Sequence, residues 1–172
     1  MKYNLTDCFE NIGKIVEEDI TLELDAVSMA GEEYELKDAS KVHMTATNIE
    51  RGKANVNCAF SCFVELPCDR CLKPVRIDIS VDSETVVFAP DYTGDTTDAS
   101  EFMDGYKFDV EELILSELCL NWPTKILCKE DCKGICSVCG KDLNDGACGC
   151  DTFVPDPRMA AIKDIFYSGK EV

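Results

Sequence analysis

The sequence predicts an α+β protein with a mainly antiparallel β-sheet domain, a few helices and a C-terminal cysteine-rich module. Apolar and polar residues alternate along residues 56–66 and again along residues 75–81. This two-residue period is typical of strands that are buried mainly on one side. Six of the twelve cysteines lie within residues 128–150. We therefore expect two domains, residues 1–127 and residues 128–172.

Four segments of the first domain show the period of a half-buried strand. The apolar members of the first two are Ile20, Leu22 and Leu24, then Val42, Met44 and Ala46. Those of the last two are Val56, Cys58, Phe60, Cys62, Val64 and Leu66, then Val75, Ile77, Ile79 and Val81. Because only residues 67–74 separate the last two, we expect an antiparallel hairpin with Cys68 and Cys71 on its connection.

Helices are predicted in three places. A short one follows Thr6, and a longer one begins at residues 109–112, whose sequence Asp-Val-Glu-Glu is typical of a capping box. The longer helix ends at residues 121–123, and its apolar stripe is Leu113, Ile114, Leu118 and Leu120. A final helix begins at residues 156–157, where Asp-Pro supplies a cap and a first-turn proline. Residues 90–105 are acidic and rich in turn formers, which predicts an exposed loop.

Residues 128–150 have the cysteine spacing C-x3-C-x3-C-x2-C-x8-C-x-C. Such close spacing suits a tetrahedral metal ion, and the interspersed glycines permit the tight turns that bring sulfurs together. Cys136-x2-Cys139 followed by Gly140 resembles a zinc knuckle. The segment is therefore predicted to be a zinc-knuckle-like module.

A disulfide framework is the rival interpretation of so many cysteines. The first residues, MKYNLTDCFENIG, lack the apolar core of a secretory signal, and no segment is long and apolar enough to span a membrane. We therefore expect a cytoplasmic protein, in which closely spaced cysteines bind metal more often than they pair. Zinc is favoured over an iron–sulfur cluster because knuckle-type pairs followed by glycine suit a closed structural zinc site.

Eight cysteines form four close pairs, and we predict that all eight are metal ligands: Cys68 and Cys71, Cys128 and Cys132, Cys136 and Cys139, Cys148 and Cys150. We expect the last two pairs to form one four-cysteine site. The first two pairs would form another, which clips the hairpin to the tail. The cofactor is thus one or two structural Zn²⁺ ions. If only one ion binds, we expect it at the four-cysteine site of the tail.

The charge of the chain is strongly negative and uneven. From Cys128 onward there are six Lys and Arg residues against eight Asp and Glu residues, so residues 1–127 hold −15 of the formal net charge of −17. Such a surface repels phosphate and favours a basic protein partner. A small local excess of positive charge at Arg70, Lys73 and Arg76 is the candidate RNA contact.

The remaining candidates favour structural roles. Cys58 and Cys62 lie on the apolar face of a strand and are expected in the core, and Cys8 and Cys119 are isolated in sequence. The single histidine, His43, is expected to be exposed, and Trp122 to be a packing anchor. No phosphate-binding glycine loop or catalytic histidine pair is present. We therefore predict that the chain is not an enzyme, although a redox role for the first CxxC is the enzymatic alternative.

Several of these motifs together resemble a known family. They are LPCDRCLKPV, the acidic loop, the helix that runs into LNWP, CKGICSVCGKDLNDGACGCD and DPRMAAIKDI. They are similar to the YceD family, described as large ribosomal RNA subunit accumulation proteins, and the tail resembles its cysteine-rich, Gram-positive-type members. The resemblance implies a non-enzymatic factor in ribosome biogenesis that supports accumulation of large-subunit ribosomal RNA.

Charge and resemblance together define the expected partners. An acidic chain is a poor general RNA binder, so we expect an adaptor that binds a basic ribosomal protein or a ribosome assembly factor. Contact with large-subunit ribosomal RNA would be secondary, and no membrane partner is expected. Two alternatives stay open, namely a zinc protein that binds RNA directly and a thiol–disulfide or metal-handling protein.

Overall fold

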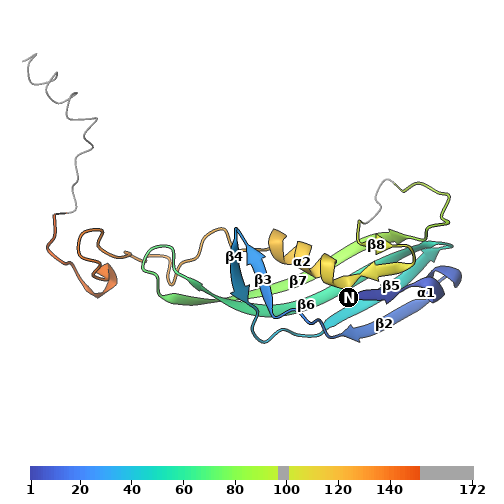
Figure 1. Ribbon diagram of the computed structural model, residues 1–172, viewed down its shortest axis with the longest axis horizontal. Helices are drawn as coiled ribbons and strands as arrows, with labels where there is room; N and C mark the ends of the chain where they lie inside the picture. Colours follow the sequence, from blue (N-terminus) through green and yellow to red (C-terminus); the bar gives the residue numbers. More distant parts are fainter. Residues whose placement is uncertain (97–100, 152–172) are drawn as a thin grey trace, which may run out of the picture. The chain divides into compact units, whose positions relative to one another are not determined.

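The computed structural model describes residues 1–96 and 101–151. In this part of the chain the fold is mainly antiparallel β-sheet with few helices (Figure 1), as the sequence predicts. The largest sheet has the strand order β2-β5-β6-β7. Its strands are β2 (Ile15–Ile20), β5 (Val42–Glu50), β6 (Lys53–Pro67) and β7 (Pro74–Phe88).

Two smaller antiparallel sheets accompany it. One has the order β1-β9-β8, and the other is the hairpin β3-β4. Their strands are β1 (Lys2–Asn4), β9 (Lys107–Asp109), β8 (Met103–Asp104), β3 (Ala26–Met29) and β4 (Glu32–Glu35). The described helices are α1 (Thr6–Glu10), α2 (Val110–Leu120) and the short 3₁₀ helix η1 (Leu143–Asp145).

The core lies on one face of the four-stranded sheet. Alternate residues of β5 and β6 are buried, and α1 contributes Cys8 and Phe9 to the same cluster. The fully buried members of this cluster include Val42, Met44, Val56, Val64, Phe108 and Ile114. Each such side chain contributes about 1.5–3 kcal/mol through removal of apolar surface from water. The sheet domain therefore has a continuous apolar core of its own.

The β6–β7 hairpin is confirmed, with Pro67 paired to Pro74 and the Cys68–Lys73 segment as its connection. The helix after Thr6 is also confirmed. The Asp109 side chain accepts a hydrogen bond from the Glu112 backbone N–H at 3.3 Å, so the predicted cap of α2 is present. Hydrophobic periodicity was therefore a sufficient signal for the hairpin, and capping chemistry for α2, whereas α1 has no side-chain cap.

Three expectations need correction. The strand predicted over Ile20, Leu22 and Leu24 is wrong, because β2 runs earlier, over Ile15–Ile20, where it pairs with β5. Leu120 is 77% exposed and is not part of the buried stripe of α2. The predicted loop over residues 90–105 contains the short strand β8 at its end. The final helix predicted from residue 156 lies outside the described residues.

The chain divides into two compact units. Among the described residues, the first contains residues 1–67 and 74–126, and the second contains residues 68–73 together with residues 127–151. Sequence analysis placed residues 68–73 in the first domain. They instead group with the cysteine-rich segment, because their backbone and side chains contact Cys128, Cys132, Ile135 and Asp142.

Candidate metal centres

The first CxxC forms a tight knuckle at the tip of the β6–β7 hairpin. The Cys68 N–H donates to the Lys73 carbonyl at 2.8 Å, and the Leu72 N–H donates to the Cys68 carbonyl at 2.9 Å. Leu72 adopts a φ of 60°, a left-handed backbone conformation that residues other than glycine rarely adopt. This turn directs both cysteine side chains to the same side.

The second CxxC repeats this scheme. The Cys136 N–H donates to the Lys141 carbonyl at 2.8 Å, and the Gly140 N–H donates to the Cys136 carbonyl at 2.9 Å. Gly140 occupies the position of Leu72, with a φ of 71°. Glycine has no Cβ to clash there, which explains its place directly after the second cysteine. The two segments therefore build the same knuckle.

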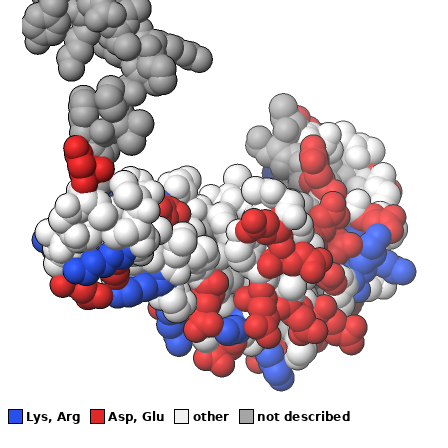
Figure 2. Space-filling model, turned by 60° about the vertical axis from the view of Figure 1, so that its left-hand side comes forward, with Lys and Arg blue, Asp and Glu red and all other residues white. Residues whose placement is uncertain are grey.

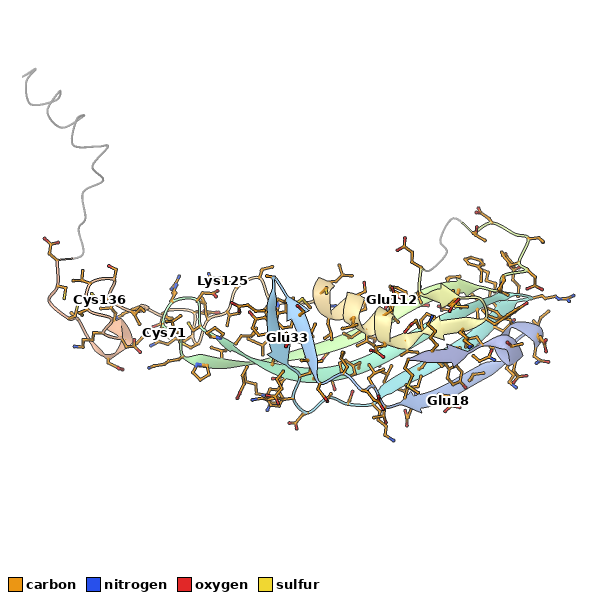
Figure 3. All side chains as sticks on the ribbon, in the orientation of Figure 1. Glu18, Glu33, Cys71, Glu112, Lys125 and Cys136 are labelled. Atoms are coloured by element: carbon orange, nitrogen blue, oxygen red, sulfur yellow. The ribbon has the colours of Figure 1, made fainter. Side chains whose placement is uncertain are left out.

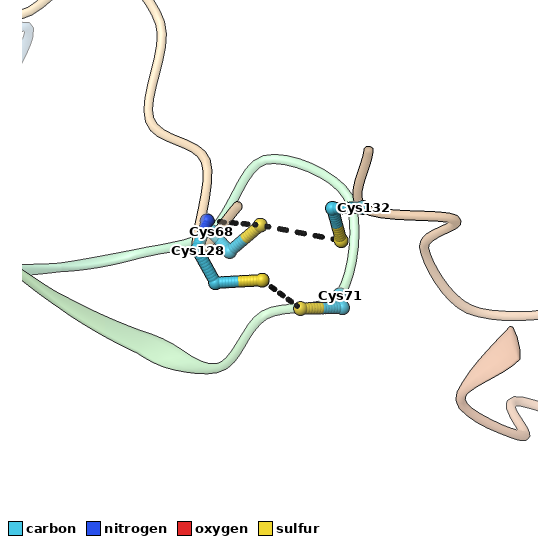
Figure 4. Close-up of side chains that lie close together, drawn as sticks. All are labelled: Cys68, Cys71, Cys128 and Cys132. Carbon is cyan, nitrogen blue, oxygen red and sulfur yellow. Dashed lines mark hydrogen bonds between the residues drawn. The ribbon is translucent and has the colours of Figure 1, made fainter. Parts of the chain in front are cut away.

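Each knuckle meets a second cysteine pair. Cys128 and Cys132 converge on the first knuckle, where the Cys68 and Cys132 sulfurs lie 3.9 Å apart and the Cys71 and Cys128 sulfurs lie 3.5 Å apart (Figure 4). All four sulfurs of this first group lie within 4.8 Å of one another. The residues come from two segments that are distant in sequence, and both segments belong to the second unit.

The second group is local in sequence. The sulfurs of Cys136, Cys139, Cys148 and Cys150 also lie within 4.8 Å of one another. Figure 3 labels one cysteine from each group, Cys71 and Cys136. The structure thus brings together all eight predicted cysteines, in the two sets of four that their spacing predicts. Metal binding by these cysteines stays a prediction.

Both groups could hold a metal ion, and their geometry fits a tetrahedral one. A zinc–sulfur bond of about 2.3 Å places the sulfurs of a tetrahedral site about 3.8 Å apart. The observed separations of 3.5 and 3.9 Å in the first group agree with this value. Four thiolates leave no open position for water or substrate, so such a site is closed and structural.

Hydrogen-bond donors surround the sulfurs of the first group. The Cys128 N–H lies 3.4 Å from the Cys68 sulfur, and the Asn144 side-chain amide lies 3.4 Å from the Cys132 sulfur. Burial opposes ionisation of Cys68, but backbone N–H donors of Arg70, Cys128 and Cys71 outweigh it and lower its pKa to about 6. The Asn144 amide likewise lowers the pKa of Cys132. These donors stabilise the thiolate, which is the form that ligates metal.

Close contact between thiols raises the pKa of at least one cysteine in each group. Contact with the Cys71 thiol is the main cause that raises the pKa of Cys128 to about 12. In the second group, backbone donors at Cys139 and Val138 lower the pKa of Cys136 to about 6, whereas contact with Cys139 raises that of Cys150 to about 12. Four thiols this close together cannot all ionise unless a cation lies among them, because their negative charges repel one another. A divalent ion would remove this conflict, so the donor set fits a metal.

The three basic residues proposed as RNA contacts each have a partner within the chain. An Arg70 Nη1–H donates to the Cys132 carbonyl at 2.6 Å, and Lys73 forms an ion pair with Asp142 at 2.7 Å. Arg76 pairs with Asp78 and lies over the Phe63 ring, 3.8 Å from its centroid. Arg70 and Lys73 thus connect the first knuckle to the tail. RNA contact by these residues stays a prediction.

Sequence reasoning missed two residues of the second unit. Asn144 reaches the Cys132 sulfur because Asp142 caps the 3₁₀ helix and fixes its first turn. Gly134 is buried with a φ of 75°, and a Cβ there would lie 2.9 Å from the Arg70 carbonyl oxygen. The sequence D-L-N-D-G is a turn signal that could have suggested the contact between Asn144 and Cys132. The second depends on the long-range contact between the two segments.

The remaining candidates lie as expected. Cys58 and Cys62 are buried in the core, and His43 is exposed beside Asp19. Trp122 stacks against Tyr34 with ring centroids 5.2 Å apart, which confirms a packing role. Within the described residues, no helix has the length and apolar character needed to cross a membrane.

The fold and the two thiol groups define a β-sheet protein with a cysteine-rich module that could hold metal ions. A family described as "Large ribosomal RNA subunit accumulation protein YceD" matches residues 56–166. The match covers the hairpin, α2 and both cysteine groups, and the chain belongs to this family.

Individual relatives match over a shorter region. An uncharacterized protein of Mycobacterium bovis and one of Mycobacterium tuberculosis are each 34% identical over 79 residues, which is 44% of this chain. The alignment spans 38% of the length of either relative. No solved structure matches the chain.

Proposed function

We propose that this chain is a non-enzymatic, cytoplasmic factor that supports accumulation of large-subunit ribosomal RNA during ribosome biogenesis. It acts as an acidic, zinc-stabilised adaptor for a basic ribosomal protein or a ribosome assembly factor. The observation that carries the proposal is the family match over residues 56–166, which includes every predicted metal ligand. The family description names large-subunit ribosomal RNA as the molecule whose accumulation is affected.

Zinc is the proposed metal because both groups consist of four thiols. Thiolates are soft ligands that select zinc over magnesium or calcium, and closed tetrahedral sites of this kind stabilise small folds. Bound zinc would supply folding energy to residues 68–73 and 127–151, where the described chain has little regular secondary structure. Because a closed site leaves no coordination position for substrate, this chemistry supports a structural role and not a catalytic one.

Charge supports a protein partner. Carboxylates dominate the first unit, and Figure 2 shows acidic side chains gathered over one part of the visible surface. Such a surface steers cationic proteins by complementary potential and repels the phosphates of RNA. Lys and Arg side chains of a ribosomal protein, which would otherwise bind RNA, are natural complements to it.

Direct RNA binding through the hairpin tip is the second candidate. It is favoured only by the basic residues Arg70, Lys73 and Arg76, each of which already contacts another residue of the chain. Binding of RNA would have to compete with those contacts. The third candidate, thiol–disulfide exchange, needs a reactive pair, whereas all of these cysteines converge in fours.

Titrations of the purified chain distinguish the candidates. The partners are basic large-subunit ribosomal proteins and naked large-subunit RNA, each at low and at physiological salt. We expect binding to a basic protein that weakens as salt rises, and weak binding to RNA. Tight RNA binding that is lost in an Arg70→Gln/Lys73→Gln/Arg76→Gln variant would replace the adaptor by direct recognition. Binding to neither would overturn both.

A further inference from the structure

The four-stranded sheet has a second face that the core does not use. In an antiparallel ladder, directly paired residues lie on the same face. The pairs Glu17 with Thr45, Thr45 with Asn57, and Asn57 with Glu84 therefore form one row across all four strands. None of these four residues is buried, in contrast to their neighbours Met44, Val56 and Cys58. We call this surface the outer face.

The middle of the outer face is uncharged. On β5 and β6 it presents short side chains, which are Thr45, Thr47, Asn55, Asn57, Ala59 and Ser61. Short side chains allow another chain to approach the sheet closely. Over residues 55–61 of β6 the central strands thus form a neutral track, which ends at Lys53 on one side and at Phe63 and Glu65 on the other.

Carboxylates line one edge of this track on β2. Glu17 and Asp19 alternate with inward residues of the strand, and both are exposed. Asp19 lies 2.9 Å from the His43 ring nitrogen, and both side chains are more than half exposed, at 63% and 56%. This edge is therefore an acidic rim, where the side chain of Asp19 contacts His43.

The opposite rim lies on β7, with Asp78, Asp82 and Glu84. The Asn57 side-chain amide donates to Asp82 at 3.0 Å, and the Asn55 amide donates to Glu84. These amides orient the carboxylates and do not neutralise them. Asp78 is paired with Arg76. The negative potential of this rim is thus concentrated at Asp82 and Glu84.

The spacing of the rims suits one protein segment. Two strands separate β2 from β7, so the rims lie about 14 Å apart at the usual interstrand distance of about 4.8 Å. A single helix with its side chains is about 10–12 Å across. Lys or Arg side chains on the flanks of one segment could therefore reach both rims at once. An RNA backbone would instead bring phosphates against both rows of carboxylates.

We infer that the outer face is a docking surface for a lysine- or arginine-rich protein segment, which lies along the neutral track between two acidic rims. This inference rests on the proposed adaptor function and deepens it, because it assigns the partner site to named residues. The argument for the occupant is charge complementarity across a sheet face whose centre is uncharged.

The test follows backbone amide NMR signals of the full chain as a lysine–alanine alternating peptide is added. A peptide with glutamate in place of lysine is the negative control. The face variant is Glu17→Gln/Asp82→Asn/Glu84→Gln. The matched control, Glu23→Gln/Glu32→Gln/Glu33→Gln, removes the same charge from exposed residues at and near the separate β3–β4 hairpin.

Signals of Thr45, Asn55, Asn57 and Ala59 should shift, and the face variant should bind roughly tenfold more weakly than the wild type. The control variant should bind within about twofold of the wild type, because surface charges away from the site contribute little. Equal weakening in both variants, or shifts spread over the whole surface, would overturn this docking surface and leave the adaptor function standing.

Two other outcomes are decisive. No binding of the cationic peptide even at low salt would overturn both the docking surface and the proposed class of partner. A single-stranded RNA that shifts the same amides more strongly than the peptide would assign the face to nucleic acid instead.

Discussion

Lys73 Nζ lies 2.7 Å from Asp142 Oδ2, and this ion pair joins the two knuckles of the cysteine-rich unit. Lys73 comes two residues after Cys71, and Asp142 follows the turn of the second knuckle. Asp142 also accepts from the Asn144 backbone N–H at 2.8 Å, and the Asn144 side chain reaches the Cys132 sulfur. The first metal group is therefore supported by residues that belong to the loop of the second.

Metal content should follow the two groups. Protein prepared under reducing conditions should contain two zinc ions per chain, because each set of four thiols fits one tetrahedral ion. Cys68→Ser/Cys71→Ser and Cys136→Ser/Cys139→Ser should each lose one ion by elemental analysis. Cys119→Ser, which alters an exposed thiol outside both groups, is the control and should retain both. A metal-free wild-type sample would contradict the assignment.

Loss of the second group should unfold the module locally. Cys139→Ser should expose backbone amides of residues 136–150 to hydrogen exchange, and a chelator should expose those of residues 128–150, because binding energy at such sites is folding energy. The strands of the first unit should stay protected, since Met44, Val56 and Phe108 belong to a separate apolar core. Retained protection of residues 128–150 after complete demetallation would favour a disulfide framework.

Asn144 should raise the zinc affinity of the first group, although it is not itself a ligand. Asn144→Ala removes the amide that donates to the Cys132 sulfur and lowers its pKa. Loss of such an outer partner typically weakens metal binding by about 10–100-fold. Competition with a colorimetric chelator measures this change. Asn121→Ala, at the end of α2 in the other unit, is the matched control and should leave zinc affinity unchanged.

Two glycines of the module should respond differently to alanine. Gly140→Ala adds a Cβ that meets nothing within 4 Å, so its cost is the left-handed backbone alone, about 1 kcal/mol. Gly134→Ala adds the same strain and a contact of 2.9 Å with the Arg70 carbonyl oxygen. Thermal unfolding of the module should therefore show the larger loss for Gly134→Ala. Equal losses would mean that the two segments do not approach as described.

Leu72 offers the reverse experiment. It holds the left-handed position that Gly140 holds in the second knuckle, and the residue is 64% exposed. Leu72→Gly relieves a strain of about 1–2 kcal/mol and gives up little buried apolar surface. The greater flexibility of glycine in the unfolded chain offsets about 0.5–1 kcal/mol of that gain. Chemical denaturation should show a module that is as stable as the wild type or more so, and a clear loss of stability would mean that Leu72 packs against the knuckle.

The sequence alone determined the hairpin, the capped helix α2 and the grouping of the cysteines. These features depend on local rules, namely the two-residue period of β6 and β7, the acceptor at Asp109 and the short spacing within each CxxC. The same rules failed at Leu22 and Leu24, which are apolar at alternate positions but follow the end of β2. Strand pairing with β5, a long-range interaction, decided where that strand lies.

The sequence predicted that Cys68 and Cys71 meet Cys128 and Cys132, but only the tertiary structure decided that the whole of residues 68–73 forms one compact unit with the tail. These residues connect β6 to β7 and interrupt the alternation of apolar and polar residues. Their position in the chain therefore suggests that they belong to the sheet domain. Contacts of Arg70 with Cys132 and Ile135, and of Lys73 with Asp142, join them to residues some sixty to seventy positions later. Such contacts leave no periodic signal in the sequence, because each depends on two segments meeting in space. For the same physical reason the outer face, which is assembled from four strands, becomes visible only through the register of the sheet.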